Sequence, residues 1–230
     1  MCGIVGYVGE NSASPILIDG LKKLEYRGYD SAGIAVSENG KTDVVKTKGR
    51  IKNLEEKLEE VGGLSGTVGI GHTRWATHGA PTDVNAHPHK GGNGRITLVH
   101  NGIIENYIEL KTMLQKGGYV FVSETDTEVL AHLFDYYYKG DLLDAMVNVM
   151  KTVRGSYAVA ILADDKPGTI IAARKDSPLI VGLGDGENFL ASDIPAVLKY
   201  TRDCYLLEDN QIAVLTKDNV TLYDTDKNVV

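Results

Sequence analysis

The chain has 230 residues, which fits one large domain or two small ones and suffices to bury a core without disulfide bonds. A formal net charge of −7 argues against a nucleic-acid or anionic-membrane partner, and two cysteines are too few for a disulfide scaffold or a four-cysteine zinc site. The sequence shows neither a signal peptide nor an apolar run long enough to span a membrane. We therefore expect a soluble, cytoplasmic protein that forms a single domain over residues 1–230.

The first hundred residues predict a mixture of strands and helices. A proline after Ser14 suits the first turn of a helix. The Asn39–Gly40 pair is typical of a tight hairpin turn. A second, charged helix over 52–61 ends at two glycines. The predicted strands of this part cover residues 2–9, 32–37, 42–48, 67–73 and 95–100.

The centre of the chain is rich in predicted helix, and the end is rich in predicted strand. Apolar residues on one stripe predict a helix over 104–116, stopped by two glycines. Thr125–Glu128 fits a capping box that opens a helix to about residue 138, and a third helix covers 141–153. Short strands follow over 158–163, 169–173, 179–184, 188–192, 204–207, 211–216 and 220–223. Because strands and helices are grouped rather than alternating, the pattern favours an α+β fold over a doubly wound parallel sheet.

Cys2 is the first candidate for covalent chemistry. If Met1 is removed, Cys2 carries the free α-amino group of the chain. Such an amine titrates near about 7.7–8.0, so roughly 10–15% is unprotonated at pH 7, against under about 0.1% of a lysine amine. A terminal cysteine therefore unites a nucleophile and a general base, whereas a retained Met1 would turn the amine into an amide. The alternative is a small apolar residue that starts a strand.

Arg74 lies in a glycine-bounded segment, Gly71–Gly79, that follows a predicted buried strand. We expect the end of this strand to run into a loop. An arginine in that place can bind a carboxylate through two parallel hydrogen bonds. The alternative is that Arg74 is a surface arginine and Trp75 a core tryptophan.

Asn101 and Gly102 stand between a predicted strand and the predicted helix at 104–116. The side-chain amide of Asn101 and the backbone N–H of Gly102, at a helix start, are donors that can form an oxyanion hole. The alternative is an Asn–Gly helix cap. Asp126 falls in the first turn of the next helix, where a carboxylate is favoured by the helix dipole whether or not it has a function.

The histidines near these segments raise the question of a metal site. His72, His78, His87 and His89 are closely spaced, but the sequence lacks a zinc signature such as His-Glu-x-x-His. It also lacks a Gly-x-Gly-x-x-Gly motif and a phosphate-binding P-loop. We therefore expect neither a metal ion nor a cofactor.

Together, six segments resemble the class II glutamine amidotransferases, a family of N-terminal nucleophile enzymes. They are Cys2–Gly6, Leu24–Gly33, His72–Gly79, Val84–His89, His100–Asn106 and Ser123–Glu128. Two later segments also match, Ser177–Leu179 and Glu187–Asp193. The sequences of residues 25–30 and 73–78 resemble those of one branch of the family. In that branch the glutaminase domain precedes a sugar-phosphate isomerase domain. The resemblance covers nearly the whole chain.

The resemblance implies a catalytic role for three residues. After loss of Met1, Cys2 would attack the side-chain carboxamide of L-glutamine, and its own amine would relay the proton. Asn101 and the Gly102 N–H would hold the tetrahedral oxyanion. Ammonia would leave, and water would release glutamate from a γ-glutamyl thioester.

It also implies how the substrate is bound. Arg74 would bind the α-carboxylate of glutamine, helped by Thr77 and His78, and Asp126 would bind the α-ammonium group. Trp75 matches the family residue that gates the passage of ammonia. Two more residues match positions near the nucleophile and would support the site: Arg27 and His87.

The fold that the resemblance implies is a four-layer α/β/β/α sandwich of two antiparallel sheets. In this branch of the family the ammonia converts fructose 6-phosphate to glucosamine 6-phosphate on the sugar-phosphate isomerase domain, which this sequence lacks. We therefore expect the chain to hydrolyse glutamine without aminating the sugar, and the full-length enzyme to be a homo-oligomer.

Three alternatives remain open at this point. The chain could be a non-catalytic domain that binds glutamine or a partner, which a retained Met1 would favour. It could be a histidine-based metal hydrolase. It could also be a class II domain that serves a different acceptor, such as phosphoribosyl pyrophosphate.

Overall fold

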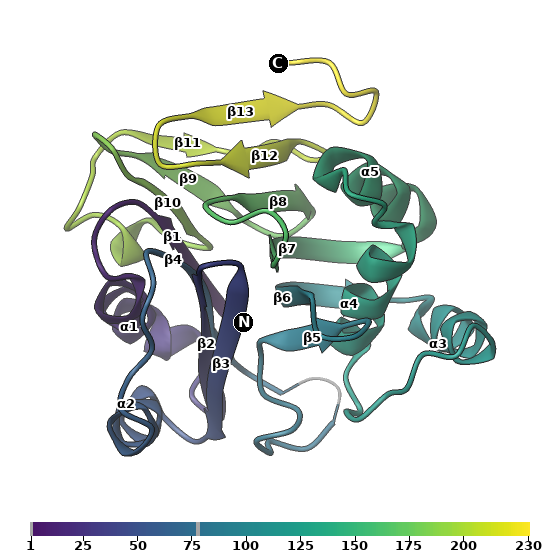
Figure 1. Cartoon of the computed structure of the whole chain (residues 1–230), viewed down its shortest axis with the longest axis horizontal. Helices are drawn as coiled ribbons and strands as arrows, with labels where there is room; N and C mark the ends of the chain where they lie inside the picture. Colours follow the sequence, from purple (N-terminus) through teal and green to yellow (C-terminus); the bar gives the residue numbers. More distant parts are fainter. Residues whose placement is uncertain (1, 77–78) are drawn as a thin grey trace.

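The computed structural model describes residues 2–76 and 79–230 and shows two stacked β-sheets with helices on both outer sides (Figure 1). Sheet one has seven strands in the order β11-β9-β10-β1-β4-β2-β3, and sheet two has six in the order β13-β12-β8-β7-β6-β5. All ladders between these strands are antiparallel. The predicted α+β class and the four-layer sandwich are therefore confirmed.

The bounds of the elements are as follows. Sheet one contains β1 (Gly3–Val8), β2 (Ser31–Glu38), β3 (Lys41–Lys48), β4 (Val68–Arg74), β9 (Ile180–Leu183), β10 (Asn188–Ala191) and β11 (Cys204–Leu206). Sheet two contains β5 (His89–Gly91), β6 (Ile96–Ile104), β7 (Gly155–Ala163), β8 (Ile170–Lys175), β12 (Ile212–Leu215) and β13 (Val220–Tyr223). The α-helices are α1 (Ala13–Leu24), α2 (Ile51–Glu60), α3 (Tyr107–Lys116), α4 (Asp126–Tyr137) and α5 (Leu142–Thr152). Two short 3₁₀ helices are η1 (Glu25–Arg27) and η2 (Ile194–Ala196).

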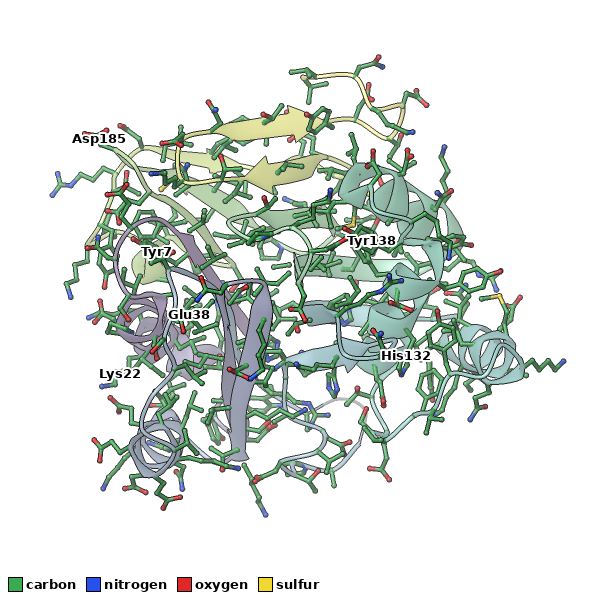
Figure 2. All side chains as sticks on the ribbon, in the orientation of Figure 1. Tyr7, Lys22, Glu38, His132, Tyr138 and Asp185 are labelled. Atoms are coloured by element: carbon green, nitrogen blue, oxygen red, sulfur yellow. The ribbon has the colours of Figure 1, made fainter. Side chains whose placement is uncertain are left out.

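Three apolar layers hold the sandwich together. One lies between sheet one and the helices α1 and α2, a second between sheet two and the helices α3 to α5, and a third between the two sheets. Tyr7 and Tyr138, among the largest fully buried side chains, belong to the two outer layers (Figure 2). Burial of apolar surface in all three layers stabilises the stacking of the sheets, at roughly 25 cal/mol per Å².

The structure corrects one predicted boundary. β6 does not end at residue 100 but continues to Ile104, because its ladder with β7 runs on to the pair Ile104–Gly155. The helix expected at 104–116 therefore begins only at Tyr107. Asn101 and Gly102 lie within a strand, so the helix-cap alternative and the helix-start position of the Gly102 N–H are both wrong.

Polar and nucleophilic side chains lie together at one end of the layer between the sheets. Residues two apart on a strand share a face of the sheet. Ile4, Ile70 and Val99 belong to this apolar layer. Cys2, His72 and Asn101 lie two positions further along the same chain segments, so they extend the inter-sheet face beyond the apolar core.

Candidate active site

A cavity of about 340 Å³ opens at this end of the sandwich. Eight of the residues singled out from the sequence line it: Cys2, Arg27, Arg74, Trp75, His87, Asn101, Gly102 and Asp126. They come from the start of the chain, from η1, β4, β6 and α4, and from a loop before β5. Thr77 and His78 lie outside the described residues. Tertiary structure thus brings together eight predicted residues that span 124 positions, from residue 2 to residue 126.

The sulfur of Cys2 lies at the end of β4. The backbone N–H of Trp75 donates to Sγ at 3.2 Å, and Sγ lies 3.5 Å from the Trp75 carbonyl oxygen, which the thiol can reach as a donor. Burial raises the pKa of the Cys2 thiol, and the Trp75 N–H only partly offsets this. The neutral thiol therefore predominates, and attack by sulfur requires a base to remove its proton.

Asn101 and Gly102 lie beside the sulfur. Nδ2 of Asn101 donates to the carbonyl oxygen of Cys2 at 3.0 Å, so the donor edge of this amide is turned toward Cys2. Gly102 has φ +125°, and a Cβ placed there would lie 2.1 Å from the carbonyl oxygen of Ser156. Both the dihedral angle and the close approach of β7 require glycine at this position.

The opposite charges of Arg74 and Asp126 are both buried in the cavity wall. Arg74 donates to the carbonyl oxygens of Gly79 at 3.1 Å and Ala80 at 3.3 Å. Oδ2 of Asp126, the first residue of α4, accepts from the backbone N–H of Ile104 at 2.9 Å. Backbone groups thus fix each charge in place, and together the two can bind a small molecule that carries a carboxylate and an ammonium group.

The mouth of the cavity is partly aromatic. Trp75 is 49% exposed and packs edge-on against Tyr29, with ring centroids 5.5 Å apart. The alternative of a core tryptophan is therefore wrong. Arg27 of η1 pairs with Asp193 at 2.7 Å. Gly28 lets η1 approach this end of β4, because a Cβ there would lie 2.6 Å from the backbone of Arg74.

Four histidines are buried in this region, His72, His87, His89 and His100, and two of them, His87 and His100, line the cavity. The rings of His72 and His87 stack with centroids 4.0 Å apart. Burial lowers the pKa of His72 to about 3 and the pKa of His87 and His89 well below the usual range, so these imidazoles are neutral. In the part of the chain that the structure describes, no group of three His, Cys, Asp or Glu side chains is arranged to hold a metal ion.

Several residues of the site were not expected from the sequence. Thr127, Ser156 and Ser177 also line the cavity; the matching segments include Thr127 and Ser177 but give neither a role, and Ser156 lies outside them. The contact of His72 with Asn101 was missed too. The sequence could have indicated that His72 lies near the site, because strand periodicity places His72 and Arg74 on the same face of β4.

A family model described as a glutamine amidotransferase domain matches residues 72–199. Two curated relatives carry the name glutamine–fructose-6-phosphate aminotransferase (isomerizing). The one from Clostridium tetani is 61% identical over 97% of this chain and 37% of its own length. The one from Clostridium perfringens is 60% identical over 100% of this chain and 38% of its own length. The chain thus spans less than two fifths of these relatives.

Solved structures show the same fold. Glutamine phosphoribosylpyrophosphate amidotransferase from B. subtilis, solved with ADP and GMP, superposes with a TM-score of 0.85 and 27% identity over 99% of this chain and 50% of its own. Among the described residues, no helix is long and apolar enough to cross a membrane. The family model spans more than half of the sequence, and the relatives match it from end to end. The chain therefore belongs to the glutamine amidotransferase domain family.

Proposed function

We propose that the chain hydrolyses L-glutamine to glutamate and ammonia through a γ-glutamyl thioester on Cys2. The observation that carries the proposal is the shared cavity, in which the Cys2 sulfur and the donor edge of Asn101 lie together with the buried charges of Arg74 and Asp126. Membership of the family and the names of the relatives support the same reaction.

The two ends of glutamine fit the two parts of the cavity. Arg74 binds the α-carboxylate and Asp126 the α-ammonium group, which leaves the side-chain carboxamide to face Cys2. Thr77 and His78 assist Arg74. His87 and Arg27 complete the wall on the side of the nucleophile. A substrate that lacks either α-group would leave one of the two buried charges without the hydrogen bonds that the substrate supplies, which costs about 1–3 kcal/mol.

The reaction proceeds in two halves. The α-amine of Cys2, free after removal of Met1, takes the thiol proton, and the sulfur forms a bond to the carboxamide carbon. The Asn101 amide and the Gly102 N–H stabilise the oxyanion. The C–N bond then breaks, the proton passes to the departing nitrogen, and ammonia leaves. Water attacks the thioester, the C–S bond breaks, and glutamate is released with the thiol restored.

Because burial raises the pKa of the Cys2 thiol, the attack needs a base that removes the thiol proton. An α-amine is roughly 10–15% neutral at pH 7 and can accept the proton without moving any other side chain. Each oxyanion donor contributes about 10²–10³ in rate.

The two relatives from Clostridium are longer proteins whose name includes fructose 6-phosphate. We propose that in a protein of that length the ammonia passes by Trp75 to a sugar-phosphate isomerase domain, which forms glucosamine 6-phosphate, and that the assembled enzyme is a homo-oligomer. The domain itself spans residues 1–230.

Glutamine hydrolysis by the purified chain tests the proposal. The wild type should release glutamate, and Cys2→Ala should abolish release while it still binds glutamine. Intact mass spectrometry should show a protein that lacks Met1 and, on quenching, a γ-glutamyl adduct on Cys2. Full activity of Cys2→Ala, or an active protein that keeps Met1, would contradict the mechanism.

A further inference from the structure

His72 lies directly behind the proposed oxyanion hole. It is fully buried on the inter-sheet face of β4 and does not line the cavity, so it does not touch the substrate. Its Nε2 lies 2.9 Å from Oδ1 of Asn101 and 3.0 Å from the carbonyl oxygen of His100. The ring therefore bridges from sheet one to β6 of sheet two at the position where the catalytic amide is held.

The pattern of these contacts fixes the proton on the ring. A backbone carbonyl oxygen only accepts hydrogen bonds, so the Nε2 that contacts it must carry the hydrogen. Nδ1 has no hydrogen-bond partner among residues 2–76 and 79–230, which suits an unprotonated nitrogen. His72 is thus a neutral donor, in accord with a pKa that burial lowers to about 3.

The same contact fixes the orientation of Asn101. Because Nε2–H donates, the Asn101 atom that faces it is the acceptor Oδ1 rather than the NH₂ group. The NH₂ group is then on the opposite edge, where it donates to the carbonyl oxygen of Cys2. An amide turned by half a rotation would set two donors against each other and would present an oxygen to the developing oxyanion.

We infer that His72 is a positioning residue of the hydrolysis, which keeps the donor edge of the Asn101 amide turned toward the reacting carbon. The inference rests on the proposed function, because it assigns a task within that reaction. His87 supports the arrangement from the other side, since its ring stacks on that of His72 and it lines the cavity. Substrate binding through Arg74 and Asp126 does not involve His72, so kcat rather than KM should depend on it.

Two amide variants form a matched pair for the test. The side chain of His72→Gln reaches about as far as Nε2 and keeps a donor there, whereas His72→Asn carries the same group on a shorter stem. We expect kcat for glutamine to fall about 10- to 100-fold in His72→Asn, with KM nearly unchanged. This is smaller than the roughly 10²–10³-fold loss on removal of one oxyanion donor, because the Asn101 amide remains but is no longer held in place. His72→Gln should recover most of the lost kcat. Equal, wild-type kcat in both variants would overturn the inference.

A double-mutant cycle distinguishes positioning of the Asn101 amide by His72 from a general disruption of the fold. In an Asn101→Ala background, His72→Asn should cause no further loss, because the amide that it orients is gone. A loss as large as in the wild-type background would overturn the inference. The rate of Cys2 alkylation by iodoacetamide needs no oxyanion hole, so it should stay at the wild-type value in His72→Asn. If Asn101→Ala itself hydrolyses glutamine normally, the oxyanion assignment of the proposed function fails first.

A measurement on the wild type avoids any dependence on variant folding. The ¹⁵N chemical shifts of the His72 ring should report a protonated Nε2 and a bare Nδ1 from pH 6 to pH 8. A ring protonated at Nδ1 would contradict the geometry, because Nε2 would then have no hydrogen for Asn101.

Discussion

At the scale of single residues, burial governs the ionisation of Cys2 and the orientation of Arg74 in the cavity. Burial raises the pKa of the Cys2 thiol, so the sulfur is held as a neutral group until a base acts. Arg74 is buried too, yet it keeps a definite orientation because the carbonyl oxygens of Gly79 and Ala80 accept from it. These constraints make the exact shape of the guanidinium matter, and not only its charge.

Replacement of Arg74 by lysine tests this point. Lysine keeps the positive charge but cannot make two parallel hydrogen bonds to a carboxylate, so KM for glutamine should rise about 10- to 100-fold, as expected for loss of a charge-assisted hydrogen bond worth about 1.5–3 kcal/mol. Steady-state kinetics of Arg74→Lys measures the change. The exposed Arg202 offers the matched control, since Arg202→Lys should leave KM as in the wild type. An unchanged KM in Arg74→Lys would remove Arg74 from the substrate site.

At the scale of elements, β6 determines where Asn101 and Gly102, the proposed oxyanion donors, lie. Its ladder with β7 continues past residue 100 and carries Asn101 and Gly102 to the end of the sandwich. Sequence periodicity missed this extension because Gly102 takes φ +125°, which no local strand pattern signals, and because the pairing partner lies more than 50 residues away at Gly155–Ala158. Strand pairing, not helix capping, therefore places these residues.

Gly102→Ala should lower the free energy of unfolding by more than about 2 kcal/mol, since a positive φ alone costs about 1–3 kcal/mol. The added Cβ would also lie 2.1 Å from the Ser156 carbonyl oxygen. Urea denaturation measures the loss, and glutaminase activity should fall with it. Gly118→Ala is the matched control, because φ is +90° there but nothing lies within 4 Å of the added Cβ. An equal loss in both variants would show that the approach of β7 contributes nothing.

The start of α4 behaves as the capping box predicts, with one difference. Thr125 caps the helix by accepting from the Glu128 N–H at 3.2 Å, but the Glu128 carboxylate accepts from the backbone N–H groups of Val122 and Ser123 rather than from Thr125. His132, labelled in Figure 2, contacts the same carboxylate and accepts from the Gly92 N–H after β5. Glu128 thus ties the loop before α4 to the helix that carries Asp126.

Glu128→Gln should destabilise the chain most at neutral pH. Burial favours the neutral form, but hydrogen bonds from His132, Ser123 and Val122 lower the pKa of Glu128 from 4.5 to about 2. Because the pKa is depressed in the folded state, this stabilisation is complete above about pH 4.5 and is lost as the pH falls through about 2. The variant should therefore lose about 1.5–3 kcal/mol at pH 7, and less at pH 3. Urea denaturation at both pH values checks this, and a pH-independent difference would contradict it.

At the scale of the whole molecule, the stacking of the two sheets creates the site. Cys2, His72 and Asn101 lie at one end of the apolar layer between the sheets, so the packing of this layer sets the distance between Cys2 and Asn101, the proposed nucleophile and oxyanion donor. The outer helices do not enter this layer, apart from the first turn of α4, which contributes Asp126.

Ile70→Ala probes this central layer. Ile70 is fully buried two positions before His72, and its truncation should leave a cavity and lower the free energy of unfolding by about 2–5 kcal/mol. Thermal or urea denaturation measures the change. Ile108 of α3 is 66% exposed, so Ile108→Ala should change stability by less than about 0.5 kcal/mol. Similar losses of unfolding free energy in Ile70→Ala and Ile108→Ala would contradict a stabilising role of the inter-sheet layer.

The sequence by itself determined most of the elements, because helix caps, turn residues and alternating apolar positions act over a few neighbours. The hairpin at Asn39–Gly40 and the helix that Thr125 opens are examples. Three elements of three residues each, β5, η1 and η2, were missed because they are too short to show a period, although β11, which is equally short, was predicted at 204–207. The family motifs also indicated which residues to expect in one site.

Only the tertiary structure decided how those residues meet. Cys2, Arg74, Asn101 and Asp126 are separated by tens of residues, and their contact depends on which strands pair and on how the two sheets stack. The orientation of the Asn101 amide depends on a histidine from the opposite sheet. Such contacts are non-local, so no window of sequence encodes them: they arise when burial of the central layer fixes the two sheets against each other.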